Sequence, residues 1–172
     1  MPKVFASPST QVTAIAETLR GELHCALLGS AGGQTLPFSV MESGSSVMSE
    51  NSSTARTVET RTVATLDSLG LALEGEYNFL KIDVQGYELE VLRGPTNSLQ
   101  AFEAVLLEVA IIEINEGAPL LHEVTTFMAE RGFIASEICE THRRPLDKAM
   151  SQIDVIFVRK GSKLLADRRY RY

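Results

Sequence analysis

The chain lacks the features that mark membrane, secreted and nucleic-acid-binding proteins. No apolar stretch is long enough to cross a bilayer, and the first ten residues do not have the layout of a signal peptide. A net charge of −6 argues against binding of nucleic acid through a basic surface. We therefore expect a cytoplasmic protein with neither a membrane nor a nucleic-acid partner.

Cysteine and histidine are also scarce. Cys25 and Cys139 lie far apart in apolar contexts, which predicts free thiols rather than a disulfide. The three histidines are scattered and show no close Cys/His spacing, so no structural zinc site is predicted. Asp83 and Glu108 alone are too few carboxylates to predict magnesium. We expect no bound metal.

Length and composition predict one α/β domain. The chain has 172 residues, of which 44% are hydrophobic and 22% charged, enough for a single hydrophobic core. Strand-like and helix-like segments alternate, which predicts a mostly parallel sheet. The last two strands, over residues 133–139 and 153–159, are joined without a helix and are predicted to be antiparallel. We expect the domain to cover residues 1–160, followed by a C-terminal tail over residues 161–172.

Patterning predicts the elements around this frame. Residues 23–28 and 36–41 are predicted to be strands that pair as a hairpin. Residues 42–57 are dominated by serine and are predicted to form a mobile loop. Residues 104–114 have the continuous apolar character of a strand covered on both faces, and an amphipathic helix is predicted between residues 119 and 132.

The stretch FLKIDVQGYELEVLRG, residues 79–94, places charge at the end of a buried strand. Lys81 and Asp83 share one face of that strand by the period of two. In open α/β sheets, ligands bind beyond the carboxyl ends of the strands. Asp83 therefore either orients a polar ligand or accepts a proton, or it caps the helix that begins near Tyr87, with Lys81 as its ion partner. Gly86 fits both alternatives, and spacing leaves the two open.

KIDVQGYELEVLRG resembles the signature of the FkbM family of S-adenosylmethionine-dependent methyltransferases, roughly K-I-D-x-[EQ]-G-x-E-x-x-V-L-x-G. Other segments resemble parts of the family in the same order: ALLGSAGG at 26–33, TLDSL at 65–69, VLLEV at 105–109 and QIDVIFVR at 152–159. The resemblance covers residues 4–159. It implies a Rossmann-like methyltransferase fold whose sheet is mostly parallel and ends in an antiparallel strand pair.

The chain also departs from the family. It has no acidic, glycine-rich cofactor loop and begins about where the family has its second strand, so the first strand is missing and the domain is expected to be N-terminally truncated. Ser7 stands where the family carries a glutamate that binds ribose hydroxyls, and a hydroxyl cannot replace a bidentate carboxylate. Without the first strand, central strand edges lack partners. We expect residues 3–6 to pair with residues 79–83, or a homodimer to exchange strands.

The resemblance implies O-methylation of a hydroxyl on a sugar, polyketide or other secondary metabolite, with S-adenosylmethionine as cofactor. Asp83 would orient or deprotonate the acceptor, and Glu88 would support the helix end or the acceptor site. The implied site residues are Asp83 and Glu88 as catalytic, Ser7, Ser45, Ser46 and Asp83 near the cofactor, and Glu108 and His142 near the acceptor.

Each role has a structural alternative. The serine-rich segment is either a flap over the acceptor or a disordered connector. Glu108 is either a site residue or a partner of Lys81, and His142 either contacts an anionic acceptor or lies in a solvated loop. A different class of function also remains open, in which the chain is a non-catalytic remnant that keeps the fold and binds a partner or metabolite.

Overall fold

The computed structural model describes residues 3–5, 22–24, 26–41, 45–53, 55–70, 78–94, 98–167 and 169–170. The predictions for Ser7 and Cys25 lie outside these residues. No helix within the described residues is long and apolar enough to cross a membrane.

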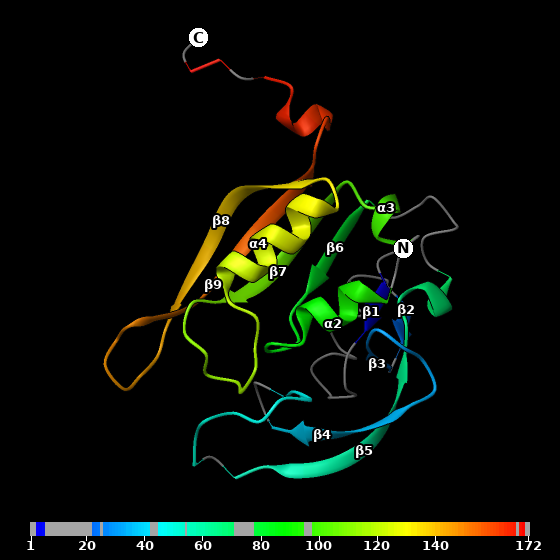
Figure 1. Ribbon diagram of the computed structural model, residues 1–172, viewed down its shortest axis with the longest axis vertical. Coiled ribbons are helices and arrows are strands. Elements are labelled where there is room, and N and C mark those ends of the chain that lie inside the picture. The colour runs from blue at the N-terminus through cyan, green and yellow to red at the C-terminus, as the bar shows by residue number, and fades with distance from the viewer. Residues whose placement is uncertain are drawn as a thin grey trace.

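The first half of the chain contributes two small sheets (Figure 1). In one, β1 (Lys3–Phe5) pairs in parallel with β2 (Glu22–His24). In the other, β5 (Thr57–Ala64) lies between β3 (Leu27–Leu28) and β4 (Thr35–Val40). The predicted hairpin between residues 23–28 and 36–41 is therefore wrong. Residues 57–62 of β5 pair with β4, and its last two residues, Val63 and Ala64, pair with β3, so β5 lies between the two strands.

The largest sheet has the order β6-β7-β9-β8. Its strands are β6 (Phe79–Ile82), β7 (Ala104–Ala110), β8 (Phe133–Arg143) and β9 (Met150–Arg159). β6 and β7 are parallel, whereas β9 is antiparallel to both β7 and β8. The antiparallel final pair is confirmed. The expectation of a mostly parallel sheet is wrong, because the β8–β9 hairpin inserts β9 beside β7 and makes the sheet mixed.

The expected closure of the sheet by residues 3–6 is also wrong. β1 pairs with β2, and in the described part of the chain β6 has β7 as its strand partner and forms the edge of the sheet. Strand exchange in a homodimer stays a prediction.

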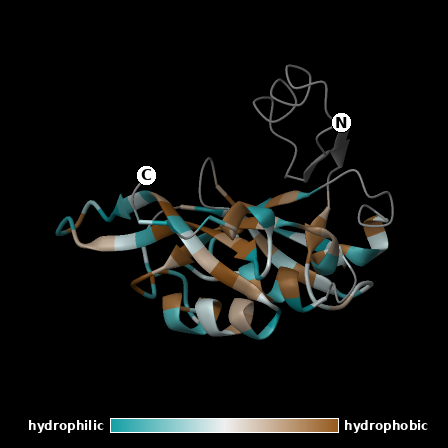
Figure 2. Cartoon of the chain, turned by 90° about the horizontal axis from the view of Figure 1, so that it is seen from above, coloured by the Kyte–Doolittle hydropathy of each residue, from teal (hydrophilic) through white to brown (hydrophobic). Residues whose placement is uncertain are grey.

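Helices cover one face of the large sheet. They are α2 (Glu88–Arg93), α3 (Ser98–Ala101) and α4 (Leu121–Glu130), with 3₁₀ turns at η1 (Asp67–Leu69) and η3 (Lys163–Leu165). Figure 1 shows α4 in front of the sheet, and the view from above in Figure 2 shows helices on one side of the strands. The amphipathic helix predicted between residues 119 and 132 is confirmed: α4 lies within these bounds, and Val124, Phe127 and Met128 on its apolar face are buried.

The core lies between these helices and the sheet. Val105, Leu107 and Val109 alternate along β7 and are buried, as is every second residue of β9 from Ser151 to Phe157. The intervening residues of β7 are half-buried, so within the described residues its second face is not fully covered. That second face carries Glu108, and it is where the predicted polar residues come together.

Candidate functional site

The turn that links β6 to α2 adopts a backbone that local sequence explains only in part. Gln85 has φ 53° and Gly86 has φ 98°, both in the left-handed region. A Cβ added at Gly86 would lie 2.8 Å from Ala118 Cβ and 2.9 Å from Met48 Sδ. Gly86 is therefore required by both conformation and space.

Glu88 stabilises this turn through hydrogen bonds to its backbone. Its Oε1 accepts hydrogen bonds from the backbone N–H of Gly86 at 3.0 Å and of Val84 at 3.4 Å, and the residue is only 2% exposed. Burial raises the pKa of the Glu88 carboxyl to about 7; the N–H bonds lower it, and the Glu108 charge raises it. Glu88 thus supports the start of α2, which is one of the two roles considered for it.

Asp83 does not cap α2, so that alternative is wrong. The helix begins after Tyr87 without a side-chain cap hydrogen bond. Lys81 is the ion partner of Asp83, as predicted, with Lys81 Nζ 3.3 Å from Asp83 Oδ2. The Asp83 side chain remains 39% exposed. The carboxylate at the end of β6 is therefore available to a ligand.

Two distant residues hold the other side of the turn. The Ser46 hydroxyl donates to the carbonyl oxygens of Gln85, at 3.0 Å, and Val84, at 3.3 Å, and it accepts from the Met48 N–H at 3.0 Å. The Asn115 side-chain amide donates to the same Gln85 carbonyl at 2.9 Å. Both Ser46 and Asn115 are buried. Asn115 was not anticipated from the sequence, because nothing near it in the chain marks it as a partner of Gln85.

The serine-rich segment is not a free connector over its described part. Besides the bonds of Ser46, the Asn51 N–H donates to the Ile114 carbonyl and the Glu116 N–H donates to the Ser49 carbonyl. Residues 45–53 form a loop without regular secondary structure, as predicted, and backbone hydrogen bonds tie this loop to the segment after β7. Its mobility stays a prediction. The Ser45 hydroxyl makes local hydrogen bonds, accepting from the backbone N–H of Met41 and donating to its carbonyl oxygen.

Gln85 connects the turn to the exposed acidic groups. Its Nε2 donates to Asp83 Oδ1 at 3.1 Å and to Glu108 Oε1 at 3.0 Å, and Gln152 Nε2 donates to Gln85 Oε1 at 3.4 Å. Glu108 is thus a partner of Gln85 rather than of Lys81. Sequence reasoning assigned no role to Gln85, although it occupies the variable [EQ] position of the signature.

Glu108, His142 and Asp154 meet across three strands. His142 Nε2 lies 3.3 Å from Asp154 Oδ1, and one side-chain oxygen or nitrogen of each residue lies within 4.8 Å of the others. His142 is part of β8 rather than a solvated loop, since the strand continues to Arg143. Burial raises the pKa of the Glu108 carboxyl, the charges of Asp83 and Asp154 raise it further, and Gln85 and His142 lower it. Asp154 was not predicted as a site residue, although a single acid within the apolar sequence of β9 could have marked it.

The described residues supply little for a cofactor. Of the described residues predicted near the cofactor, Ser45 and Ser46 have hydroxyls that are hydrogen-bonded to the backbone. Asp83 has a partly exposed carboxylate. These residues do not form a cradle for the ribose and methionine of S-adenosylmethionine.

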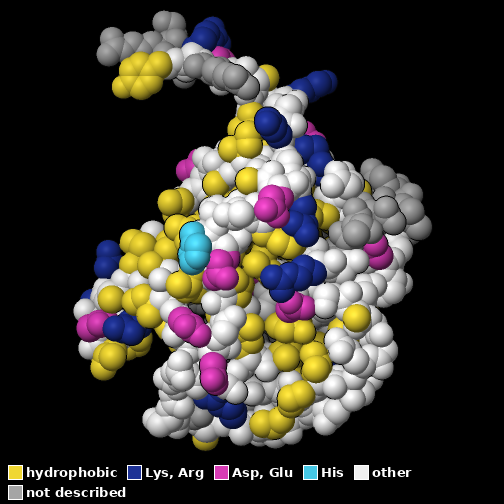
Figure 3. Space-filling view, in the orientation of Figure 1, with side chains coloured by type: hydrophobic (Ala, Val, Ile, Leu, Met, Phe, Trp, Pro, Cys, Tyr) yellow, Lys and Arg dark blue, Asp and Glu magenta, His cyan; other side chains and the backbone are white. Residues whose placement is uncertain are grey.

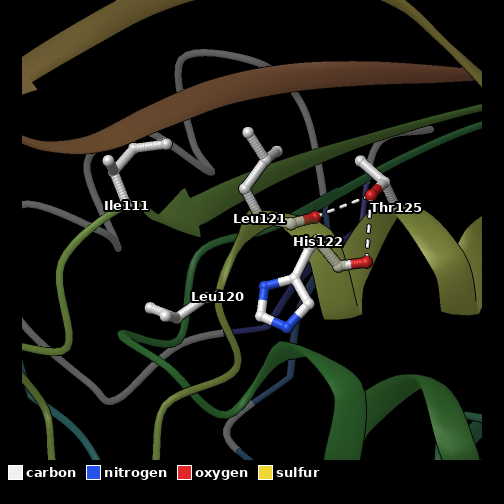
Figure 4. Close-up of a pocket in the computed structure, with 5 residues that line it drawn as sticks. All are labelled: Ile111, Leu120, Leu121, His122 and Thr125. Atoms are coloured by element: carbon white, nitrogen blue, oxygen red, sulfur yellow. Dashed lines mark hydrogen bonds between the residues drawn. The ribbon is translucent and has the colours of Figure 1, made fainter.

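The other face of the sheet differs. Figure 3 shows acidic, basic and apolar side chains interspersed on the face that carries α4. A shallow, mostly apolar hollow lies at the start of α4 (Figure 4), lined by Ile111, Leu120, Leu121, His122 and Thr125. Among the residues that the structure describes, none of those predicted for the site lines this hollow.

Comparisons with known proteins place the chain among methyltransferases. The model of the methyltransferase FkbM domain matches residues 8–135, and the chain belongs to this family, which generally uses S-adenosylmethionine. The hexuronic acid methyltransferase AglP of Haloferax volcanii is 32% identical over 83 residues, which cover 42% of this chain and 35% of that protein. The matched segment thus spans about a third of that relative. No solved structure matches significantly.

Proposed function

We propose that the chain is an S-adenosylmethionine-dependent O-methyltransferase that acts on a hydroxyl group of a sugar or related metabolite. The observation that carries this proposal is the Asp83 carboxylate, which stands exposed at the carboxyl end of β6 on a turn fixed by buried hydrogen bonds. Membership of the FkbM family supports the reaction class. The name of the similar AglP, a hexuronic acid methyltransferase, supports a sugar acceptor.

Asp83 is suited to the proton that an alcohol must lose during methylation. Gln85 Nε2 contacts one carboxylate oxygen and Lys81 Nζ the other, so the group has a fixed orientation. Each carboxylate oxygen can accept more than one hydrogen bond, which leaves capacity for an acceptor hydroxyl. We assign Asp83 the role of aligning this hydroxyl and accepting its proton.

Glu88 is proposed as a positioning residue. Its buried carboxylate contacts backbone N–H groups of the turn and does not reach the exposed face. It therefore acts on the reaction through the conformation of residues 84–86. S-adenosylmethionine supplies the methyl group in this class of reaction; no step is assigned to Ser45 or Ser46, whose hydroxyls are engaged.

Glu108 and His142 are proposed to line the acceptor site. The Glu108 carboxylate shares the Gln85 amide with Asp83, so an acceptor whose hydroxyl meets Asp83 would lie beside Glu108. Carboxylates accept hydrogen bonds from neighbouring hydroxyls, as sugar acceptors require.

The test is methyl transfer from labelled S-adenosylmethionine to a panel of acceptors that includes hexuronic acids, neutral hexoses and hydroxylated polyketides. We expect one acceptor class to be methylated, with Asp83→Asn lowering kcat by about 100-fold or more. Glu130→Gln, on α4, is the matched control and leaves kcat unchanged. Activity of Asp83→Asn within about two-fold of the parent would contradict the assignment.

Calorimetric titration with the cofactor and with S-adenosylhomocysteine distinguishes the enzyme from the alternative, a non-catalytic remnant that keeps the fold. If the folded chain binds neither at about 1 mM, the chain is a non-catalytic binding module rather than an enzyme.

A further inference from the structure

Three potential metal ligands meet on the open face of the large sheet. Glu108 lies on β7, Asp154 on β9 and His142 on β8, and they offer one nitrogen or oxygen atom each within 4.8 Å of one another. His142 and Asp154 lie beyond residues 8–135, which the family model matches. Two of the three ligands therefore come from the C-terminal strand pair, outside the matched range.

Strand register holds the cluster in place. Glu108 is directly opposite Asp154 on the antiparallel strands β7 and β9, and His142 is opposite Gln152, two residues from Asp154. Two carboxylates directly opposite each other on neighbouring strands repel and destabilise the sheet. In the described part of the chain, no lysine or arginine forms an ion pair with either carboxylate. The fold thus places the Glu108 and Asp154 carboxylates opposite each other, with the His142 imidazole close to both.

We propose that Glu108, His142 and Asp154 bind a divalent transition-metal ion. One imidazole nitrogen and two carboxylate oxygens form a mixed donor set, which suits Mn²⁺ or Zn²⁺ better than Ca²⁺ or Mg²⁺, both of which prefer oxygen ligands alone. The cation replaces the repulsion between the two carboxylates with attraction to both. Since the three side chains are only partly buried, further coordination positions remain open toward solvent.

Gln85 orients one of the ligands. Its Nε2 donates to Glu108 Oε1, and such a hydrogen bond fixes the direction of a ligating carboxylate. The same amide nitrogen contacts Asp83. The metal site therefore adjoins the carboxylate at the end of β6.

This proximity suggests a use for the cation, and that use rests on the proposed function. A face lined by Asp83, Glu108 and Asp154 repels an anionic acceptor. A bound cation reverses this by offering open coordination positions to the carboxylate or paired hydroxyls of an acidic sugar. Metal binding itself requires neither methyl donor nor acceptor.

The experiment is a titration of the chelator-treated full chain with Mn²⁺, followed by electron paramagnetic resonance of the free ion and by calorimetry. We expect one Mn²⁺ per chain, with Glu108→Gln and Asp154→Asn each weakening the affinity by about ten-fold or more. Glu130→Gln removes a carboxylate on α4, which covers the other face, and leaves the affinity unchanged. Zn²⁺ should compete with Mn²⁺ more strongly than Mg²⁺ does.

A second readout keeps the test decisive if a variant fails to fold. In the parent protein, substoichiometric Mn²⁺ should broaden the ring proton signals of His142 more strongly than those of His122, which lies on α4. Absence of binding at about 1 mM of either ion, or equal affinity in folded Glu108→Gln, overturns the proposal. Binding that is unaffected by Asp83→Asn, in a chain without methyl transfer, would retain the metal site and refute the proposed function.

Discussion

Glu88 couples the stability of the site to pH, and this coupling can be measured. Burial raises the pKa of its carboxyl from 4.5 to about 7. An acid with a higher pKa in the folded chain binds its proton more tightly there than in the unfolded chain. Glu88 therefore does not lower the unfolding free energy at pH values below the unfolded pKa of 4.5, and it lowers that free energy by the full amount above about pH 7. Stability from this group falls as pH rises between these values.

The magnitude follows from the shift. The difference of about 2.5 pKa units, at roughly 1.4 kcal/mol per unit, gives about 3 to 4 kcal/mol, of which roughly 2 to 3 kcal/mol falls between pH 5 and pH 8. Glu88→Gln removes the titration and keeps a carbonyl oxygen that can accept the Gly86 N–H. Relative to the parent, the variant should gain roughly 2 to 3 kcal/mol of unfolding free energy from pH 5 to pH 8.

The assay is urea unfolding of both proteins at the two pH values, in the presence of a chelator so that no cation alters the charge of Glu108. Glu130→Gln is the control, and its effect should be small at both pH values because that side chain is 70% exposed. A parent-to-variant difference that is the same at pH 5 and pH 8 would refute the reasoning. It would mean that the folded state holds Glu88 no differently from the unfolded chain.

Two further predictions concern the same turn and are checked by urea unfolding. Gly86→Ala should lower the unfolding free energy by about 3 kcal/mol, because the new Cβ is both crowded and on a residue with an unfavourable positive φ. The control Gly33→Ala has a positive φ in open space and should lower the unfolding free energy by about 1 kcal/mol. Equal losses in the two variants would show that crowding at Gly86 is absent. Ser46→Ala should cost about 1 to 3 kcal/mol by leaving buried backbone groups unpaired, and Ser45→Ala should cost less than about 1 kcal/mol because its bonds are local and only partly buried. Similar losses in the two serine variants would argue against the role of Ser46.

The site was predictable where its parts are neighbours in the chain. The period of two places Lys81 beside Asp83, and the structure confirms their contact. The glycine before α2 and the apolar stripe of α4 likewise mark a turn and a helix without reference to the rest of the molecule. The signature around them was enough to indicate the family.

Strand order could not be derived in the same way. The alternating burial pattern of β9 fits pairing with more than one strand, and its place between β7 and β8 is set by contacts between segments far apart in the chain. Since Asp154 reaches Glu108 and His142 only through that order, the acidic cluster was not visible as a unit. The register of long-range pairing decided it.

Residues that are neighbours in the chain were enough to predict the end of β6, the Gly86 turn, the start of α2 and the family to which they belong. The contacts that hold these elements in place come from distant parts of the chain. Ser46 and Asn115 reach Gln85 across 39 and 30 residues, and Glu88 became a buried support rather than an exposed acid. The physical reason is that local backbone preferences act over a few residues, whereas the pairing of buried polar groups is settled only when distant segments pack together.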